Sequence, residues 1–242
     1  MPALLLIAHG SRDPRHAATV AALVEEVRAQ RPGTEVATAY LDHCAPRIPQ
    51  VVGRLADAVA VPLLLNRAFH AKHDIPAALR ASGSRLPVAD VLGPSPLLLA
   101  ALDRRLAGAG LDVSSPAVRA ATGVVLAAAG SSDPAADAAT RAVAAEWRRT
   151  RGWAAVEVAY ASATGPRVPD ALAALRAAGA GRTAVAPYLL APGLLPDRIA
   201  AAAGGADTVA DVLGPAPEVA ALLLARYDRA LRATRTPRAL TA

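Results

Sequence analysis

Hydrophobic positions along the chain follow two alternating patterns, short continuous apolar runs and longer segments with apolar residues at helical spacing. The first run spans 3–8, and after Asp13-Pro14 the residues Val20, Leu23 and Val27 recur on one helical face. Continuous apolar runs are typical of strands that are covered on both faces. The strands expected in the first part of the chain are 3–8, 34–41, 59–65 and 87–92. Strands that alternate with helices in this way indicate an α/β fold with a parallel sheet.

The whole pattern occurs a second time after a segment at 108–121 that contains Gly, Ser and Pro. His9 aligns with Ala129, 120 positions later, and several short segments match at nearly the same offset. The matching segments are Pro46-Arg47-Ile48-Pro49 with Pro166-Arg167-Val168-Pro169, and Asp90-Val91-Leu92-Gly93-Pro94 with Asp211-Val212-Leu213-Gly214-Pro215. The sequence therefore predicts a duplication, with tandem domains at 1–107 and 122–235, each a four-stranded parallel sheet flanked by helices.

Composition narrows the class of protein. Hydrophobic residues make up 54% of the 242 residues and aromatic residues only 3%, so few side chains could stack on nucleic-acid bases. The formal charge of +6 is spread along the chain without a basic run, which argues against nucleic acid as a partner. The single Cys44 rules out an intrachain disulfide. No apolar stretch approaches the roughly 18 residues of a membrane span, so we expect a soluble, cytoplasmic protein without a membrane partner.

Two histidines stand directly after strands of the first predicted sheet. His9 follows the first strand and His70 follows the third. Because parallel strands end at the same edge of a sheet, the two imidazoles can converge there. Such a pair suits a divalent iron, cobalt, nickel or zinc ion, and an imidazole can also take up a proton near neutral pH. In the second copy Ala129 and Leu195 stand at these positions, so the chemistry is expected in the first copy alone.

Other residues near this edge are weaker candidates. Ser11 and the amides at the start of the first helix could receive an anionic group, and several cations could attract carboxylates. These cations are Arg12, Arg15, Arg47, Arg67 and Lys72. Asp42, His43 and His73 are possible additional groups, whereas His16 is expected to face water. The sequence lacks G-x-G-x-x-G and G-x-x-x-x-G-K-[ST], so we expect no nucleotide, and it lacks the G-x-S-x-G of α/β-hydrolases.

With these residues in view, the chain resembles the sirohydrochlorin chelatases, the ATP-independent class II tetrapyrrole chelatases. The segments that carry the resemblance are His9-Gly10-Ser11-Arg12-Asp13-Pro14 and Phe69-His70-Ala71-Lys72-His73-Asp74-Ile75-Pro76. It covers nearly the whole chain, because long members of the family contain two tandem halves. The chain departs from the family at Ala68, where a glycine is usual, and at Ala45, where an acidic residue is common.

The resemblance implies roles for individual residues. His9 matches the histidine credited with metal binding and proton acceptance, and His70 matches the second metal-binding histidine. The loop from Arg67 to Lys72 corresponds to the segment that contacts the tetrapyrrole. Its predicted substrate contacts are Arg67, Ala68, Phe69, Ala71 and Lys72. A cleft between the halves would hold the flat ring, with the second half as the opposite wall.

The implied reaction is insertion of Fe²⁺ or Co²⁺ into the anionic tetrapyrrole sirohydrochlorin, on the route to sirohaem or cobalamin. The metal would be a substrate, and one chain with two halves would act as a monomer. A protein that carries metal or tetrapyrrole without turnover is the first alternative. The second is phosphoryl transfer with His9 as nucleophile, which would favour an Arg-His-Gly arrangement, whereas Ala8 precedes His9 here. The sequence does not choose between iron and cobalt, because an imidazole site follows general affinity order.

Overall fold

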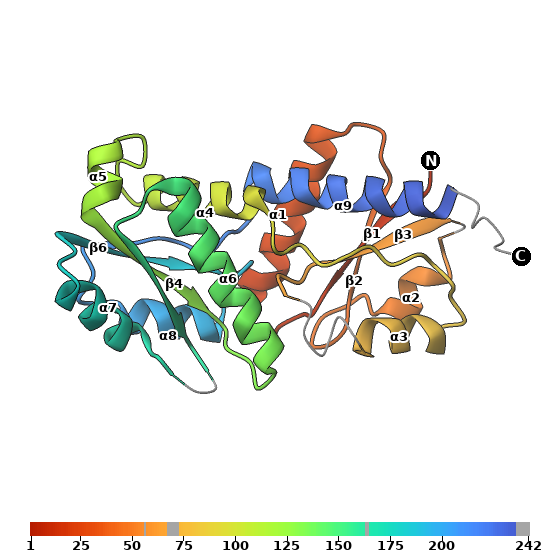
Figure 1. Cartoon of the computed structure of the whole chain (residues 1–242). Helices are drawn as coiled ribbons and strands as arrows, with labels where there is room; N and C mark the ends of the chain where they lie inside the picture. The colour runs from red at the N-terminus through yellow and green to blue at the C-terminus, as the bar shows by residue number, and fades with distance from the viewer. Residues whose placement is uncertain (56, 67–72, 163–164, 236–242) are drawn as a thin grey trace, which may run out of the picture.

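The computed structural model describes residues 1–55, 57–66, 73–162 and 165–235, and its elements form two halves that lie side by side (Figure 1). The first part of the chain contains β1 (Ala3–Ala8), α1 (Pro14–Gln30), β2 (Val36–Tyr40), α2 (Ile48–Val52), β3 (Ala58–Pro62), α3 (Ile75–Ala81) and α4 (Pro96–Gly108). The second part contains α5 (Pro116–Ala121), β4 (Thr122–Ala128), α6 (Pro134–Arg151), β5 (Ala155–Tyr160), α7 (Val168–Ala177), β6 (Arg182–Pro187), α8 (Leu194–Ala202), β7 (Thr208–Val209) and α9 (Pro217–Arg235).

The two sheets are parallel and share one strand order, β2-β1-β3 in the first half and β5-β4-β6-β7 in the second. The predicted α/β fold, with two parallel sheets flanked by helices, is confirmed. Every residue of β1 is buried, as its continuous apolar run predicts. Leu4 and Leu6 face a core that runs through both halves, whereas Leu5 and Ile7 face a separate core on the other side of the sheet. Because the large core is shared, the halves are joined by packing as well as by sequence.

The main helices begin where the sequence places caps. The Asp13 carboxylate accepts a hydrogen bond from the Arg15 backbone N–H (2.9 Å), and Pro14 occupies the first helical position of α1. In α6 the Asp133 carboxylate accepts from the Ala135 N–H in the same way (2.9 Å). These caps satisfy amides that a helix start leaves without intrahelical partners. They also fix α1 and α6 at the strand ends, where the candidate site lies.

One helix of each half lies on the other half. The blue C-terminal helix α9 packs against α1 and β3, while α4 packs against β6 and α9 (Figure 1). The fully buried Tyr227 of α9 donates its hydroxyl hydrogen to the Pro2 carbonyl. The Arg31 guanidinium meets the Asp228 carboxylate at 2.6 Å. The last helix of each sequence repeat, α4 or α9, therefore packs on the sheet of the other repeat.

The first sheet has three strands rather than the four expected. The predicted strand at 87–92 reaches β3 only through an isolated parallel bridge at Val88, whereas β7 pairs with β6 in the second half. Pro87 has no N–H to donate to a ladder. The preceding Leu86 gives its N–H to the Ser84 hydroxyl (3.2 Å) instead of to β3. A proline and a local turn thus shorten the pairing.

Two further boundaries differ from the sequence prediction. The third strand ends at Pro62 rather than at Leu65, and the end of the expected linker at 108–121 is helix α5. Ser115 caps α5 by accepting a hydrogen bond from the Val118 N–H (3.3 Å). No helix within the described ranges has both the length and the apolar character needed to cross a bilayer.

Candidate active site between the two halves

A cavity of about 1020 Å³ lies between the two halves, lined by the segments that follow β1, β3, β4 and β6. The carboxyl ends of both parallel sheets therefore border one space, which is where α/β folds place their ligands. Its volume is at the upper end of the roughly 300–1,000 Å³ typical of small-molecule sites. The cleft expected between the halves is thus present.

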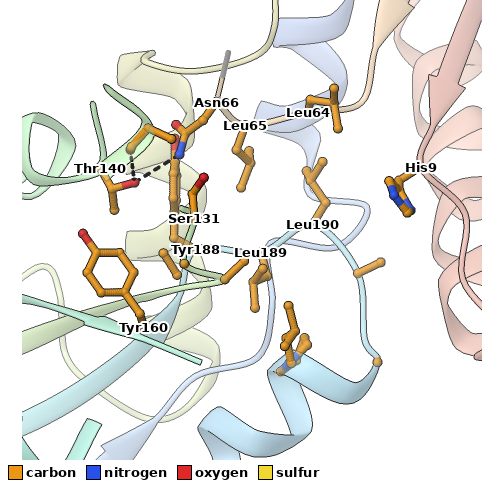
Figure 2. A pocket seen from close by; sticks show the side chains of 18 of the residues that line it. His9, Leu64, Leu65, Asn66, Ser131, Thr140, Tyr160, Tyr188, Leu189 and Leu190 are labelled. Atoms are coloured by element: carbon orange, nitrogen blue, oxygen red, sulfur yellow. Dashed lines mark hydrogen bonds between the residues drawn. The ribbon is translucent and has the colours of Figure 1, made fainter. Parts of the chain in front are cut away.

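The wall supplied by the second half combines aliphatic residues with polar side chains, among them Ser131, Asp133 and Asp137. Figure 2 shows Tyr188, Leu189 and Leu190 across from His9, with Leu64 and Leu65 of the first half also bordering the cavity. Leu195, which the sequence aligns with His70, lines this wall as well. The described residues that line the cavity include no arginine or lysine. The space suits a ligand with a large apolar surface, and within the described lining the imidazoles come from the first half, whereas the carboxylates of Asp133 and Asp137 come from the second.

His9 follows the last residue of β1, as predicted, and borders the cavity. Its ring is half-buried, with Nδ1 3.1 Å from the Gly10 carbonyl oxygen. The ring of His43 lies 6.3 Å away, centroid to centroid, at an interplanar angle of 42°. Within the described residues, no group of three or more His, Cys, Asp or Glu is arranged to hold a metal ion.

The partner predicted for His9 lies outside the described residues. This applies to His70 and to the five substrate contacts of the same loop, namely Arg67, Ala68, Phe69, Ala71 and Lys72. Convergence of the two imidazoles therefore stays a prediction. The strands that carry them are neighbours, since β1 pairs directly with β3.

The loop that carries His9 is held by backbone geometry and by a thiol. Gly10 has φ +91°, and a Cβ at this position would lie 1.8 Å from the Asp42 carbonyl oxygen. Only glycine fits such a conformation and such a close approach. The Cys44 thiol donates to the Ser11 carbonyl (3.0 Å), and its sulfur accepts from the Ser11 N–H (3.5 Å). This bracing role of Cys44 was missed in the sequence, where its single occurrence indicated only the absence of disulfides.

Ser11 lines the cavity, as predicted, but the nearby amides are already partnered. The Ser11 N–H faces Cys44, the Asp13 N–H donates to the Ser11 hydroxyl (3.1 Å), and the Arg15 N–H bonds to Asp13. The geometry therefore gives no support to anion binding by these three amides. Arg12 is exposed and is not among the residues that line the cavity.

Arg47 is engaged within its own loop rather than in the cavity. Its guanidinium donates to the Leu41 carbonyl (2.6 Å) and to the Asp42 carboxylate (2.9 Å). In the second half, Arg167 donates to the Tyr160 carbonyl (3.0 Å). Because the half that lacks the histidines keeps this contact, the geometry indicates that Arg47 supports the loop.

The remaining polar candidates lie at different places around the site. The pKa of Asp42 is held below its ordinary value, because the His43 backbone N–H and the Arg47 guanidinium both bond to its carboxylate. Neither Asp42 nor His43 is among the cavity-lining residues, whereas the exposed His73 is.

His16 lies in a different environment from the one that the sequence predicts. It was expected to face water, but it is half-buried and lines the cavity, and its Nδ1 is buried without a hydrogen-bond partner among the described residues. Burial lowers the pKa of His16, and the nearby His9 lowers it further. A usable signal was its position in the first turn of α1, because that turn starts at the functional edge of the sheet. Ala136 stands at the matching place in the second half.

Polar groups on the opposite wall were also missed. The Asn66 amide donates to the Thr140 hydroxyl (3.0 Å), which links the two halves across the cavity (Figure 2). The buried hydroxyls of Tyr160 and Tyr188 have no hydrogen-bond partner in the described part of the chain. Burial raises the pKa of Tyr188, so this phenol is neutral at ordinary pH.

Comparison with known proteins identifies relatives over most of the chain. The CbiX family model matches it twice, over residues 3–109 and 123–230. The chain is 28% identical to the sirohydrochlorin ferrochelatase of Priestia megaterium over 209 residues, which cover 82% of this chain and 77% of the relative. It is 27% identical to the sirohydrochlorin cobaltochelatase of the same organism over 224 residues, which cover 82% and 67%.

A solved structure supports the architecture. SirB from Bacillus subtilis with Fe³⁺ matches with a TM-score of 0.77 and 24% sequence identity, and the match covers 94% of each chain. At this identity the likeness establishes the fold. The two family matches follow one another in the order of the internal repeat and together cover most of the sequence. The chain therefore belongs to the CbiX family.

Proposed function

We propose that this protein is a sirohydrochlorin chelatase, which inserts a divalent metal, Fe²⁺ or Co²⁺, into the anionic tetrapyrrole sirohydrochlorin without a nucleotide. The observation that carries the proposal is the cavity of about 1020 Å³ in which His9 lies across from Leu189 and Leu190 of the second half. Curated relatives named as a ferrochelatase and a cobaltochelatase of sirohydrochlorin support the substrate and the two metals.

The reaction needs a base and a place for the metal. A metal-free tetrapyrrole carries two pyrrole N–H protons, and both must leave as one divalent ion bonds to its four nitrogens. His9 can accept one of these protons once its ring nitrogen no longer holds the metal, because an imidazole can act as a general base, and the second proton passes to water. With His70 it presents the metal to the ring, since neutral imidazoles are good ligands for Fe²⁺ and Co²⁺.

Support for the predicted substrate contacts is uneven. Ser11 lines the cavity. The role proposed for the loop 67–72 rests on its sequence motif alone. Arg12 and Arg47 have the least support, because neither lines the cavity and Arg47 is bonded within its own loop. Cations for the peripheral carboxylates of the substrate are therefore assigned to Arg67 and Lys72.

Further features of the proposal concern the whole molecule. The duplicated units are assigned to 1–107 and 122–235, close to the two family matches at 3–109 and 123–230. Because one chain supplies both walls of the cavity, we infer that the monomer is the active unit. A single cysteine suits a reducing compartment, which supports a cytoplasmic location.

A multiple-turnover assay tests the proposal. The purified protein is mixed with excess sirohydrochlorin and with Fe²⁺, Co²⁺ or Ni²⁺ in turn, without ATP, and the absorption change of the metallated ring is followed. We expect many equivalents of product per protein with Fe²⁺ or Co²⁺. A carrier would bind one equivalent of metal or ring without accelerating metallation, and that result would replace the enzyme with the alternative.

Replacement of His9 gives the first mutational prediction. We expect His9→Ala to lower the rate of metallation by about 10²–10⁴-fold, the usual contribution of a positioned general base, with little loss of stability because Ala129 fills this position in the second half. The exposed Arg28→Ala of α1 serves as control. Near-normal metallation by His9→Ala would remove His9 from the mechanism.

A further inference from the structure

A small hollow of about 50 Å³ adjoins the main cavity. The residues that border both spaces are His9, His16, Leu63, Leu190 and Ala191. The rest of its lining is Ala8, Thr19, Val20 and Leu23. Among the described residues of this lining, the two imidazoles are the only side chains with nitrogen, and the Thr19 hydroxyl already donates to the Arg15 carbonyl (2.8 Å). At about 30 Å³ per water, the hollow has room for about one or two water molecules or an ion.

The part of the chain that the structure describes gives the imidazole of His16 no hydrogen-bond partner. Its Nδ1 is buried without a hydrogen-bond partner among the described residues, and its ring lies 6.3 Å from that of Tyr40. Native proteins leave few buried polar atoms unpaired, so each such atom calls for an explanation. Folding does not require an imidazole here, because the second half builds the same helix start with Ala136.

Building on the proposed chelatase function, we propose that His16 is a metal-binding residue of this chain, which with His9 holds the incoming divalent ion at the small hollow before the ion enters the tetrapyrrole. Two imidazoles supply part of a coordination shell, and the hollow and cavity leave space for water to complete it. Among the other described residues of this lining, Thr19 alone has a polar side chain, and its hydroxyl is bonded to the Arg15 carbonyl. Release to the ring is favourable because four pyrrole nitrogens replace two imidazoles.

Metal binding without tetrapyrrole is the direct test. Co²⁺ is titrated into the parent protein by calorimetry, with visible absorption to detect a change in Co²⁺ coordination. His16→Ala copies the second half, and His16→Gln keeps a polar side chain of similar length. Thr19→Val is the matched control, because it alters the same hollow while preserving side-chain volume. Thermal unfolding of each variant confirms that it is folded.

The proposal requires both His16 variants to bind Co²⁺ at least about tenfold more weakly, the low end of what even a supporting contact contributes to a metal site. Thr19→Val should stay within about twofold. Parent-like affinity in the His16 variants would overturn the proposal, as would a parent protein that binds no Co²⁺ in the absence of tetrapyrrole. An equal loss in Thr19→Val would also overturn it, because the effect would then belong to the shape of the hollow.

The same variants separate this inference from the proposed function. If the parent protein binds Co²⁺ through His16 but never metallates sirohydrochlorin, the metal site is supported and the chelatase function is contradicted. If the parent protein turns over normally and His16→Ala has the same Co²⁺ affinity and the same KM for the metal, the chelatase function is supported and the metal site at His16 is contradicted.

Discussion

The two halves of the molecule share a framework and differ in the side chains that face the cavity. Gly10 and Gly130 have φ of +91° and +90°, and each lies against the carbonyl of the neighbouring loop. The first three strands of each half have the same order, and β7 adds a fourth to the second sheet. At the cavity, however, His9 and His16 of the first half correspond to Ala129 and Ala136 of the second.

This difference separates what folding needs from what chemistry needs. Both halves form the same strand–loop–helix start, so the framework residues are sufficient for the fold. The imidazoles are present in one half alone, so they are explained by a function at the cavity. The second half contributes the opposite wall of the cavity and, through α9, part of the core that both halves share.

The packing of α9 on the first half and of α4 on the second leads to the prediction with the largest expected effect on stability. Tyr227→Ala in α9 and Leu102→Ala in α4 each remove a fully buried side chain. We expect a loss of about 3–5 kcal/mol of unfolding free energy for the first and about 2–5 for the second. Hydrogen exchange should accelerate most in β1 and β3 for Tyr227→Ala, and most in β6 for Leu102→Ala.

The opposite pattern of hydrogen exchange would contradict this prediction. If each half of the sequence folded as its own unit, Tyr227→Ala would loosen β4–β6 and Leu102→Ala would loosen β1–β3. That pattern of exchange would contradict the packing of α9 on the first half.

The duplication and most of the fold could be predicted because they depend on local pattern. The apolar run 3–8 matches β1 at both ends, and Asp13-Pro14 marks the start of α1. The packing of α4 and α9 on opposite halves could not be predicted, because the hydrophobic pattern of an amphipathic helix does not show which of the two sheets it covers. The missing fourth strand depended on Pro87, a single residue whose lost N–H ended the pairing.

The candidate site was predictable where it follows from strand direction. His9 and Ser11 border the cavity because they come directly after β1. Arg47 was assigned to substrate on charge alone, but charge does not reveal that its guanidinium already donates to the Leu41 carbonyl and to the Asp42 carboxylate. His16 was expected to be exposed because it does not belong to the apolar face of its helix. The first turn of that helix, however, borders the cavity.

Matched alanine substitutions of the two loop glycines sharpen the comparison. In Gly10→Ala the new Cβ would lie 1.8 Å from the Asp42 carbonyl, and in Gly130→Ala 2.3 Å from the Ser162 carbonyl. Backbone strain and overpacking together predict a loss of about 3 kcal/mol in each variant. Per folded molecule, metallation should fall strongly in Gly10→Ala, because His9 is displaced, and only slightly in Gly130→Ala. Urea unfolding and the metallation assay measure both, and equal losses of activity would show that His9 needs no such positioning.

The smallest effect concerns the contact that holds α9 to the first half. The Arg31 guanidinium bonds to both Asp228 oxygens, at 2.6 and 2.7 Å, and each side chain is 31% exposed. Allowing for solvent screening, we expect Asp228→Asn to lower the unfolding free energy by about 1 kcal/mol at pH 7. A double-mutant cycle with Arg31→Ala isolates the pair, and no coupling at pH 7 would mean that packing alone holds the helix.

The pH dependence of this pair tests its electrostatic origin. Hydrogen bonding to Arg31 lowers the pKa of Asp228 below its ordinary value. A carboxyl whose pKa is lower in the folded protein contributes stability above its unfolded pKa of about 3.9 and loses it as the pH falls through the folded value. The stability difference between the parent and Asp228→Asn should therefore be constant from about pH 5 to 8 and shrink below about pH 4. Because other carboxyls titrate in both proteins, the difference reports Asp228, and a difference that grew on acidification would show that the contact is not an ion pair.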